Sequence, residues 1–386
     1  MMKPEIVLPR VAVAATGLGH IAPGIEAWAI ELAASLRRRN VPVRLFGAAA
    51  GADNIEVIPC FVRTSSIAQH LAVFFRNLGG WRYGLGSTYD VEQLSFAISL
   101  WRRIRKDYDI LHVQDPLLAS ILDKLNRMGL SRARVILANG TGENVDRLKT
   151  LSYVQEILPP ALEPWKAAQG KVPRLFLAPN FINMNTFAPG NQAIARQRLD
   201  LPADAYVVFC SAAIRRYHKR IDYLLQEFST FRDRFTGRAL LVVAGGRESD
   251  TEELMELGRK LLGNDVCFMV GVPREKMPDL YRAADLFALT SLFETGSIAV
   301  IEAIASGLSV VCHDTPTLRA LAGPSNQYVN MATVGALASA ITNAAQSADT
   351  ADAGIASRTY ALATYSEEVV IQRIIDMYRE VARIGM

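Results

Sequence analysis

The fold class of this chain follows first from residues 11–46, VAVAATGLGHIAPGIEAWAIELAASLRRRNVPVRLF. Residues 11–15 are a short apolar run typical of a buried strand, and a glycine-bearing loop follows at 16–24. Apolar side chains then recur on one helical face: Ile25, Trp28, Leu32 and Leu36. Three arginines at 37–39 suit the negative end of that helix, and alternation at 41–45 indicates the next strand. This strand–helix–strand unit predicts a parallel sheet with a right-handed crossover.

The same alternation continues along the chain. Further strands are predicted at 109–113, 134–138, 174–180, 206–213, 239–246, 266–271, 285–290 and 308–312. Helices are predicted at 220–235, in the alanine-rich segment 332–357 and at 366–384. Two successive doubly wound series in 386 residues predict an α/β protein with two Rossmann-like domains and a boundary near 185–200. Ligands of such sheets bind outside the carboxyl ends of the strands, so we expect the site in a cleft between the domains.

Composition disfavours several classes of protein. The 42 basic and 38 acidic residues give a formal net charge of +4, which does not require nucleic acid as a partner. Cys60, Cys210, Cys267 and Cys312 show no CxxC spacing, which argues against a zinc site or a disulfide framework. Neither a signal-peptide pattern nor an apolar run of membrane-spanning length is present. A cytoplasmic protein is therefore expected.

The glycine loop raises an alternative. Residues 17–22, GLGHIA, formally match the GxGxxA pattern of dinucleotide-binding proteins. The second strand ends in Leu45, Phe46 and Gly47 without an acidic residue for a ribose, and the helix begins only after Gly24. These features disfavour a nicotinamide or flavin cofactor. The loop then either covers the cleft or brings backbone NH groups to a phosphate or sugar.

A second feature is ETGSIAVIE at 294–302, in which Glu294 and Glu302 flank a predicted helix start with Ser297 as N-cap. Backbone NH groups at this helix N-terminus predict an anion site: those of Gly296, Ser297 and Ile298. Carboxylates that bind hydroxyls beside NH groups that bind phosphates suit a sugar nucleotide. Alternatively, both glutamates are solvated surface residues.

Four cations follow the strand at 206–213: Arg215, Arg216, Lys219 and Arg220. At the same sheet edge, a cation would stabilise the charge that develops on a departing nucleoside diphosphate. In an exposed loop, the same run would be only solvated charge. No DxD-type pattern stands out, so no metal site is predicted.

At these motifs the sequence resembles the retaining GT-B glycosyltransferases of glycosyltransferase family 4, over nearly the whole chain. The resemblance is carried by 178–189 (APNFINMNTFAP), 219–222 (KRID), the block 270–311 with its E-x7-E pair, and the helices at 23–36 and 365–378. It implies a GT-B fold, in which two Rossmann-like domains face each other across a cleft and the C-terminal helix returns to the N-terminal domain. The implied domains are an acceptor domain, 1–188 plus 367–386, and a donor domain, 189–366.

The resemblance also implies roles for individual residues. Glu302 would bind the ribose, Glu294 the transferred sugar, and Lys219 the diphosphate. Further donor contacts are implied for the following: Gly24, Val272 near the base, and the NH groups of Gly296, Ser297 and Ile298. The implied reaction is metal-independent transfer with retention from a UDP- or GDP-sugar co-substrate, and no cofactor takes part.

Two departures from the family pattern bear on the site. The usual glycine–arginine pair before the lysine is Ala213-Ile214 here, so Arg215 or Arg216 takes over the phosphate contact, and which of them does so stays open. Asn139 stands where family members often carry a histidine that contacts the donor sugar, which indicates an altered donor sugar or lost activity. Two other functions therefore stay open, a catalytically silent sugar-nucleotide-binding protein and another GT-B enzyme such as an epimerase or phosphorylase.

The acceptor is expected on the N-terminal domain and would be a glycan, a lipid-linked glycan or a small molecule. Segment 61–106 is rich in aromatic and basic residues: Phe74, Phe75, Arg76, Trp81, Arg82, Trp101, Arg102, Arg103, Arg105 and Lys106. They would dock on an anionic membrane surface, or form a helical pair with buried aromatic rings and solvated arginines. Peripheral contact with the inner membrane face therefore stays an alternative, and nucleic acid is not an expected partner.

Overall fold

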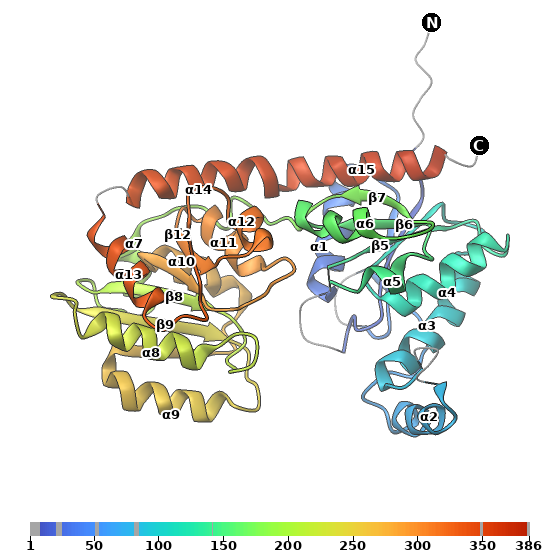
Figure 1. Cartoon of the computed structure of the whole chain (residues 1–386). Helices are drawn as coiled ribbons and strands as arrows, with labels where there is room; N and C mark the ends of the chain where they lie inside the picture. The colour runs from blue at the N-terminus through green and yellow to red at the C-terminus, as the bar shows by residue number, and fades with distance from the viewer. Residues whose placement is uncertain are drawn as a thin grey trace, which may run out of the picture. The chain divides into compact units, whose positions relative to one another are not determined.

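The computed structural model describes residues 8–20, 25–50, 54–80, 85–140, 142–347 and 350–383. The chain divides into two compact units, Met1–Ala178 with Val370–Met386, and Pro179–Val369. Figure 1 shows both, with the colour running from blue at the N-terminus to red at the C-terminus. Across the described ranges, no helix has both the length and the apolar character needed to cross a bilayer.

The first unit is built on a parallel sheet in the order β3-β2-β1-β4-β5-β6-β7. Its strands are β1 (Val11–Ala15), β2 (Val43–Gly47), β3 (Ile55–Val57), β4 (Ile110–Val113), β5 (Arg134–Ala138), β6 (Tyr153–Glu156) and β7 (Arg174–Leu177). Its helices are α1 (Ile25–Arg38), α2 (Ser66–Asn77), α3 (Thr88–Ile104), α4 (Pro116–Arg127), α5 (Val145–Leu148), α6 (Glu163–Ala167) and most of α15 (Glu367–Arg383). Every residue of β1 is fully buried, as expected for a parallel strand covered on both faces.

The second unit repeats the plan with the order β10-β9-β8-β11-β12-β13. Its strands are β8 (Tyr206–Ser211), β9 (Ala239–Gly245), β10 (Val266–Val270), β11 (Leu286–Leu289), β12 (Ser309–His313) and β13 (Gln327–Val329). Its helices are α7 (Gln192–Arg198), α8 (Ile221–Arg232), α9 (Thr251–Leu262), α10 (Met277–Ala283), α11 (Ile298–Ala305), α12 (Pro316–Ala322), α13 (Ala336–Gln346) and α14 (Thr350–Tyr365). Figure 1 shows α8 and α9 on one side of this sheet and α11 and α14 on the other. Two parallel Rossmann-like sheets confirm the predicted α/β fold class.

The first sheet contains a strand that the apolar pattern did not predict. Strand β6 has the sequence YVQE, and its polar Gln155 and Glu156 are both buried. The amide of Gln155 donates to the carbonyl of Ala178 at 2.8 Å, and Glu156 accepts from Trp165 Nε1 at 2.7 Å. Because tertiary partners satisfy these polar groups, the strand is buried without an apolar sequence. β3 and β13 were also not predicted, and each has only three residues.

The units divide nearer the N-terminus than the predicted boundary between 188 and 189. Residues before that boundary are held by side chains of the second unit. The guanidinium of Arg358 donates to the carbonyls of Phe187 at 2.7 Å and Met184 at 3.1 Å, and Arg282 donates to Ala188 at 3.0 Å. These bonds attach the connecting segment to the second unit.

The C-terminal helix returns to the first unit, as predicted. The hydroxyl of Tyr378 lies 2.7 Å from Nδ1 of the buried His112 on β4. Arg134 donates to the carbonyl of Ala382 at 2.9 Å, which caps the end of α15. These contacts explain why residues from Val370 onward group with the first unit.

Candidate functional site

The order of strands in the second sheet reverses between β8 and β11. In open parallel sheets, ligands bind at the carboxyl ends of the strands at such a switch point. The loops that leave these two strands, 212–220 and 290–297, carry Lys219 and Glu294. The tertiary structure therefore brings together two residues 75 positions apart.

Lys219 and Glu294 form the central contact of this edge. Nζ of Lys219 lies 2.5 Å from Oε1 of Glu294, and the two side chains are only 16% and 9% exposed. The hydroxyl of Thr290 donates to the carbonyl of Lys219 at 2.7 Å, which joins the two loops. The two groups thus form a largely buried ion pair, in which each charge offsets the cost of removing the other from water.

The backbone around Lys219 turns sharply. His218 and Arg220 have left-handed φ values of 70° and 53°, which non-glycine residues seldom adopt. The His218 ring stacks on Phe293, with centroids 4.0 Å apart and 29° between the planes. Burial and the neighbouring positive charge of Lys219 lower the pKa of His218. The ring therefore packs as a neutral aromatic group beside the ion pair.

The two candidate arginines have different partners. Arg216 donates to Glu253 at 2.7 Å, lies 3.5 Å from Asp222, and its backbone NH donates to Asp250 at 2.7 Å. Arg215 lies 4.0 Å from Glu248, and its Nε is buried without a hydrogen-bond partner among the described residues. Arg216 is therefore held by acidic residues of α8 and α9 and of the α9 N-cap, whereas Arg215 keeps donor capacity for a ligand.

Ser297 is the N-cap of α11, as predicted, although its hydroxyl makes no capping bond. The first NH groups of the helix are consequently not capped by that side chain, and a helix N-terminus of this kind favours anions. Asn180 Nδ2 donates to the carbonyl of Gly296 at 3.3 Å, which holds the preceding turn. Gly307 follows the helix with a φ of 79°, in agreement with its predicted place after the C-cap.

Glu302 lies one turn into α11 and is 2% exposed. It accepts a hydrogen bond from the hydroxyl of Tyr281 at 2.8 Å and pairs with the guanidinium of Arg274. Burial, and secondarily the charge of Glu302, raise the pKa of Tyr281, so its phenol stays a hydrogen-bond donor. The Arg274 guanidinium also lies over the ring of Phe187, 4.9 Å from its centroid. Arg274 and Tyr281 thus cover the carboxylate from two sides.

Val272 is half-buried and follows β10 after Gly271, whose φ is 68°. Strand β10 stands two positions from β8 in the sheet, so Val272 lies farther along the same edge.

Asn139 belongs to the first unit, at the carboxyl end of β5, and is 6% exposed. Its amide nitrogen donates to the two carboxylate oxygens of Glu156 at 3.0 and 3.2 Å. Its amide oxygen accepts from the NH of Glu143 at 2.9 Å. The amide therefore ties the backbone of Glu143 to β6.

Three predicted residues, Gly24, Trp81 and Arg82, lie outside the described residues. In segment 61–106, α2 and α3 form a pair of helices, on which Phe74 is 57% exposed while Trp101 donates to the carbonyl of Leu130 at 3.0 Å. No group of three His, Cys, Asp or Glu side chains that could hold a metal ion occurs within the described ranges.

The sequence analysis missed Arg274, Tyr281 and His218. Arg274 and Tyr281 reach Glu302 from another element, so no short sequence spacing relates them. His218 directly precedes the predicted site residue Lys219, and this adjacency is the sequence feature that could have pointed to it.

Comparison with known proteins places this site in a family context. Residues 191–353 match the family model for glycosyl transferases group 1. D-inositol 3-phosphate glycosyltransferase from Nocardia farcinica is 32% identical over 148 residues, 36% of this chain and 32% of that protein. Mannosylfructose-phosphate synthase from Agrobacterium fabrum is 38% identical over 101 residues, 24% of this chain and 22% of that protein. The matches thus span about a third or less of these relatives.

Solved structures match over almost the whole chain. Sucrose-phosphate synthase from Thermosynechococcus elongatus has a TM-score of 0.74 and 18% identity, covering 97% of this chain and 99% of that one. Anabaena HepE in complex with UDP and glucose has a TM-score of 0.73 and 16% identity, covering 96% and 100%. These matches confirm the GT-B type of fold, with two Rossmann-like domains in one chain. The Lys219–Glu294 pair and α11 lie within residues 191–353, the part of the chain that matches the family model for glycosyl transferases group 1.

Proposed function

We propose that the chain is a metal-independent retaining glycosyltransferase of glycosyltransferase family 4. It moves a sugar from a UDP- or GDP-sugar to an acceptor hydroxyl on a glycan, a lipid-linked glycan or a small molecule, in the cytoplasm and without a cofactor. The observation that carries the proposal is the Lys219–Glu294 ion pair beside the N-terminus of α11, at the point where the strand order reverses.

The donor would extend along this edge. Glu302 would bind the ribose hydroxyls, and the base would lie near Val272. The NH groups from Gly296 to Ile298 would bind phosphate, and Glu294 would bind the hydroxyls of the transferred sugar. For Gly24, which lies outside the described residues, a role in binding the donor is proposed on the resemblance alone. We further propose that Asn139 acts indirectly by holding the backbone at Glu143, because its amide is already bonded to Glu156 and Glu143.

The chemistry needs a departing diphosphate whose charge is stabilised. The bond between the anomeric carbon and the diphosphate oxygen breaks, and the acceptor oxygen bonds to the same face of that carbon. The acceptor proton passes to the departing diphosphate oxygen. Lys219 and Arg215 would stabilise the growing negative charge, which is the kind of interaction that lowers a barrier.

The names of similar proteins support this choice of reaction. The Nocardia relative is called a glycosyltransferase, and the Anabaena structure holds UDP and glucose. Both facts concern those proteins and motivate the choice of a nucleotide-sugar donor here.

The test is a thermal-shift panel of UDP-, GDP- and ADP-sugars, followed by turnover with the best binder and NMR of the anomeric configuration of the product. We expect one sugar nucleotide to stabilise the protein and the product to keep the anomeric configuration of the donor. A chain that no sugar nucleotide stabilises would contradict the proposal. Binding without turnover would favour a silent sugar-nucleotide-binding protein.

A further inference from the structure

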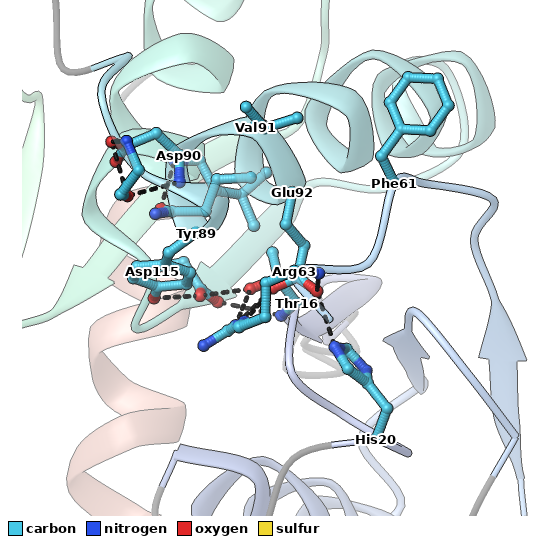
Figure 2. A network of polar contacts seen from close by, with 12 residues as sticks. Thr16, His20, Phe61, Arg63, Tyr89, Asp90, Val91, Glu92 and Asp115 are labelled. Atoms are coloured by element: carbon cyan, nitrogen blue, oxygen red, sulfur yellow. Dashed lines mark hydrogen bonds and ion pairs between the residues drawn. The ribbon is translucent and has the colours of Figure 1, made fainter. Parts of the chain in front are cut away.

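The first unit contains a polar network that the donor site does not use. Six side chains make it: Thr16, His20, Arg63, Tyr89, Glu92 and Asp115. Figure 2 shows them converging from separate segments of the chain. Thr16 follows β1 and Asp115 follows β4, and these neighbouring strands mark the reversal of strand order in the first sheet. The network therefore occupies the place where a doubly wound sheet binds its ligand.

Glu92 on α3 is the acceptor on one side of the network. Its fully buried side chain accepts from Arg63 Nε at 2.5 Å and from the Arg63 backbone NH at 3.0 Å. His20 Nε2 lies 2.7 Å from the same carboxylate. Arg63 is 24% exposed and His20 13% exposed, so both present an edge to solvent while Glu92 holds them in place.

Asp115 is the acceptor on the other side. The hydroxyl of Tyr89 donates to it at 2.6 Å and that of Thr16 at 2.7 Å. Burial raises the pKa of Asp115, and burial together with the nearby carboxylate raises the pKa of Tyr89, which keeps the phenol a donor. The guanidinium of Arg63 lies over the Tyr89 ring, 4.1 Å from its centroid, and thereby joins the two halves of the network.

The balance of charge decides what this site can bind. The network holds two carboxylates, one guanidinium and the imidazole of His20, and the guanidinium is already paired with Glu92. A phosphate near Arg63 would also lie near Glu92, so attraction and repulsion would largely cancel, and its desolvation would be uncompensated. A neutral hydroxyl instead donates to a carboxylate or imidazole and accepts from a guanidinium.

We propose that this polar network is the acceptor-binding site and that it selects an uncharged, hydroxyl-bearing sugar or polyol over its phosphorylated counterpart. This inference rests on the proposed transferase function. The proposed preference for an uncharged acceptor differs from what the names of the relatives suggest. D-inositol 3-phosphate glycosyltransferase and mannosylfructose-phosphate synthase are both named after phosphorylated compounds.

The test uses two matched pairs of probes with the full chain at neutral pH: glucose with glucose 6-phosphate, and myo-inositol with inositol 3-phosphate. Saturation-transfer NMR measures binding without a donor. We expect the neutral member of at least one pair to bind about tenfold more tightly than the phosphorylated member. Tyr89→Phe and His20→Gln should weaken that binding about three- to tenfold, because each removes one group of the site.

Two controls separate this site from other effects. Arg103→Ala breaks another Arg–Glu pair of the same unit, with Glu56, and should change nothing. An excess of UDP, which would occupy the proposed donor site of the other unit without altering the chain, should also preserve the signal. A signal that UDP displaces would be binding at the donor site and would overturn the proposal.

Glu92→Gln is expected to increase the binding of the phosphorylated probes, a change that unfolding or local disruption of the site cannot produce. It leaves Arg63 without its carboxylate, so binding of the phosphorylated probes should rise at least about threefold. Equal or tighter binding of the phosphorylated probes by the unaltered protein, or no binding of either neutral probe, would overturn the proposal. Binding of sugar nucleotides is measured separately, with the thermal-shift panel on the unaltered protein. Failure of the proposed transferase function can therefore be distinguished from failure of the proposed acceptor selectivity.

Discussion

Nζ of Lys219 lies 2.5 Å from Oε1 of Glu294, although the proposed donor needs these two groups for opposite purposes. Lys219 would bind phosphate, and Glu294 would bind sugar hydroxyls. Without a ligand, the two groups neutralise each other in a nearly buried pair. Breaking such a pair leaves one charge buried and uncompensated, and this typically costs about 3–5 kcal/mol.

Lys219→Ala should therefore affect both stability and turnover. We expect a lower melting temperature and a fall in kcat of about 10²–10³, the size typical of removing one stabilising group from a transition state. The double variant Lys219→Ala/Glu294→Ala should be more stable than either single variant, because no unpaired charge is left behind. Lys166→Ala breaks the exposed pair with Glu163 and should cost less than about 1 kcal/mol. Full turnover in Lys219→Ala would exclude the assigned role.

Arg274 should compete with the ribose for Glu302. Arg274→Ala removes the cation that covers this carboxylate, so we expect a nucleoside diphosphate to bind up to about tenfold more tightly by calorimetry. Glu302→Ala should weaken binding about ten- to a hundredfold, because hydrogen bonds to a charged group contribute about 1.5–3 kcal/mol. Arg198→Ala, which breaks the surface pair with Asp279, is the matched control. Weaker binding in Arg274→Ala would show that Arg274 itself contacts the nucleotide.

The two arginines after β8 should differ in function. Arg215→Ala should lower kcat/KM about a hundredfold if its unpartnered Nε faces phosphate. Arg216→Ala should leave kcat/KM nearly unchanged and lower the melting temperature only slightly, because its guanidinium forms partly exposed pairs with Glu253 and Asp222. Steady-state kinetics and melting curves of both variants decide the assignment, and the reverse order of effects would give the phosphate contact to Arg216.

His112 should make the protein less stable in acid. Burial lowers the pKa of His112 from 6.5 to about 3. In the unfolded chain the imidazole is therefore protonated below about pH 6.5, whereas in the folded chain it stays neutral down to about pH 3. The free energy of unfolding consequently decreases as the pH falls from 6.5 towards 3. The expected loss from His112 alone is about 2 kcal/mol at pH 5.

The measurement is the melting temperature between pH 7 and pH 5, compared with His112→Gln. Buried carboxylates such as Asp115 and Glu156, whose pKa values are raised by burial, act with the opposite sign, so only the difference between variants isolates the histidine. The control His70→Gln changes an exposed histidine on α2 and should keep the slope of the unaltered protein. An identical slope in His112→Gln would show that this histidine does not titrate differently in the folded state.

The amino-acid pattern alone was enough to predict the α/β class, the repeated strand–helix alternation and the returning C-terminal helix. It did so because strands buried on both faces must be apolar along their length, as in VAVAA, and because helix ends follow local rules, as at Ser297 and Gly307. It also indicated which loops would carry the proposed donor site, since carboxyl ends of parallel strands share one edge. Strand β6 was not predicted because its buried residues Gln155 and Glu156 are polar, and their hydrogen-bond partners lie elsewhere in the sequence.

Which charged side chains pair with each other is visible only in the tertiary structure. Lys219 pairs with Glu294, Arg274 with Glu302 and Arg63 with Glu92, and each pair joins separate segments of the chain. It also showed that the amide of Asn139 is bonded within its own unit. A local pattern fixes burial and secondary structure through short-range sterics and apolar periodicity. The partner of a buried charge depends on strand order and helix placement, because desolvation is offset only by a group that the fold brings within hydrogen-bonding distance.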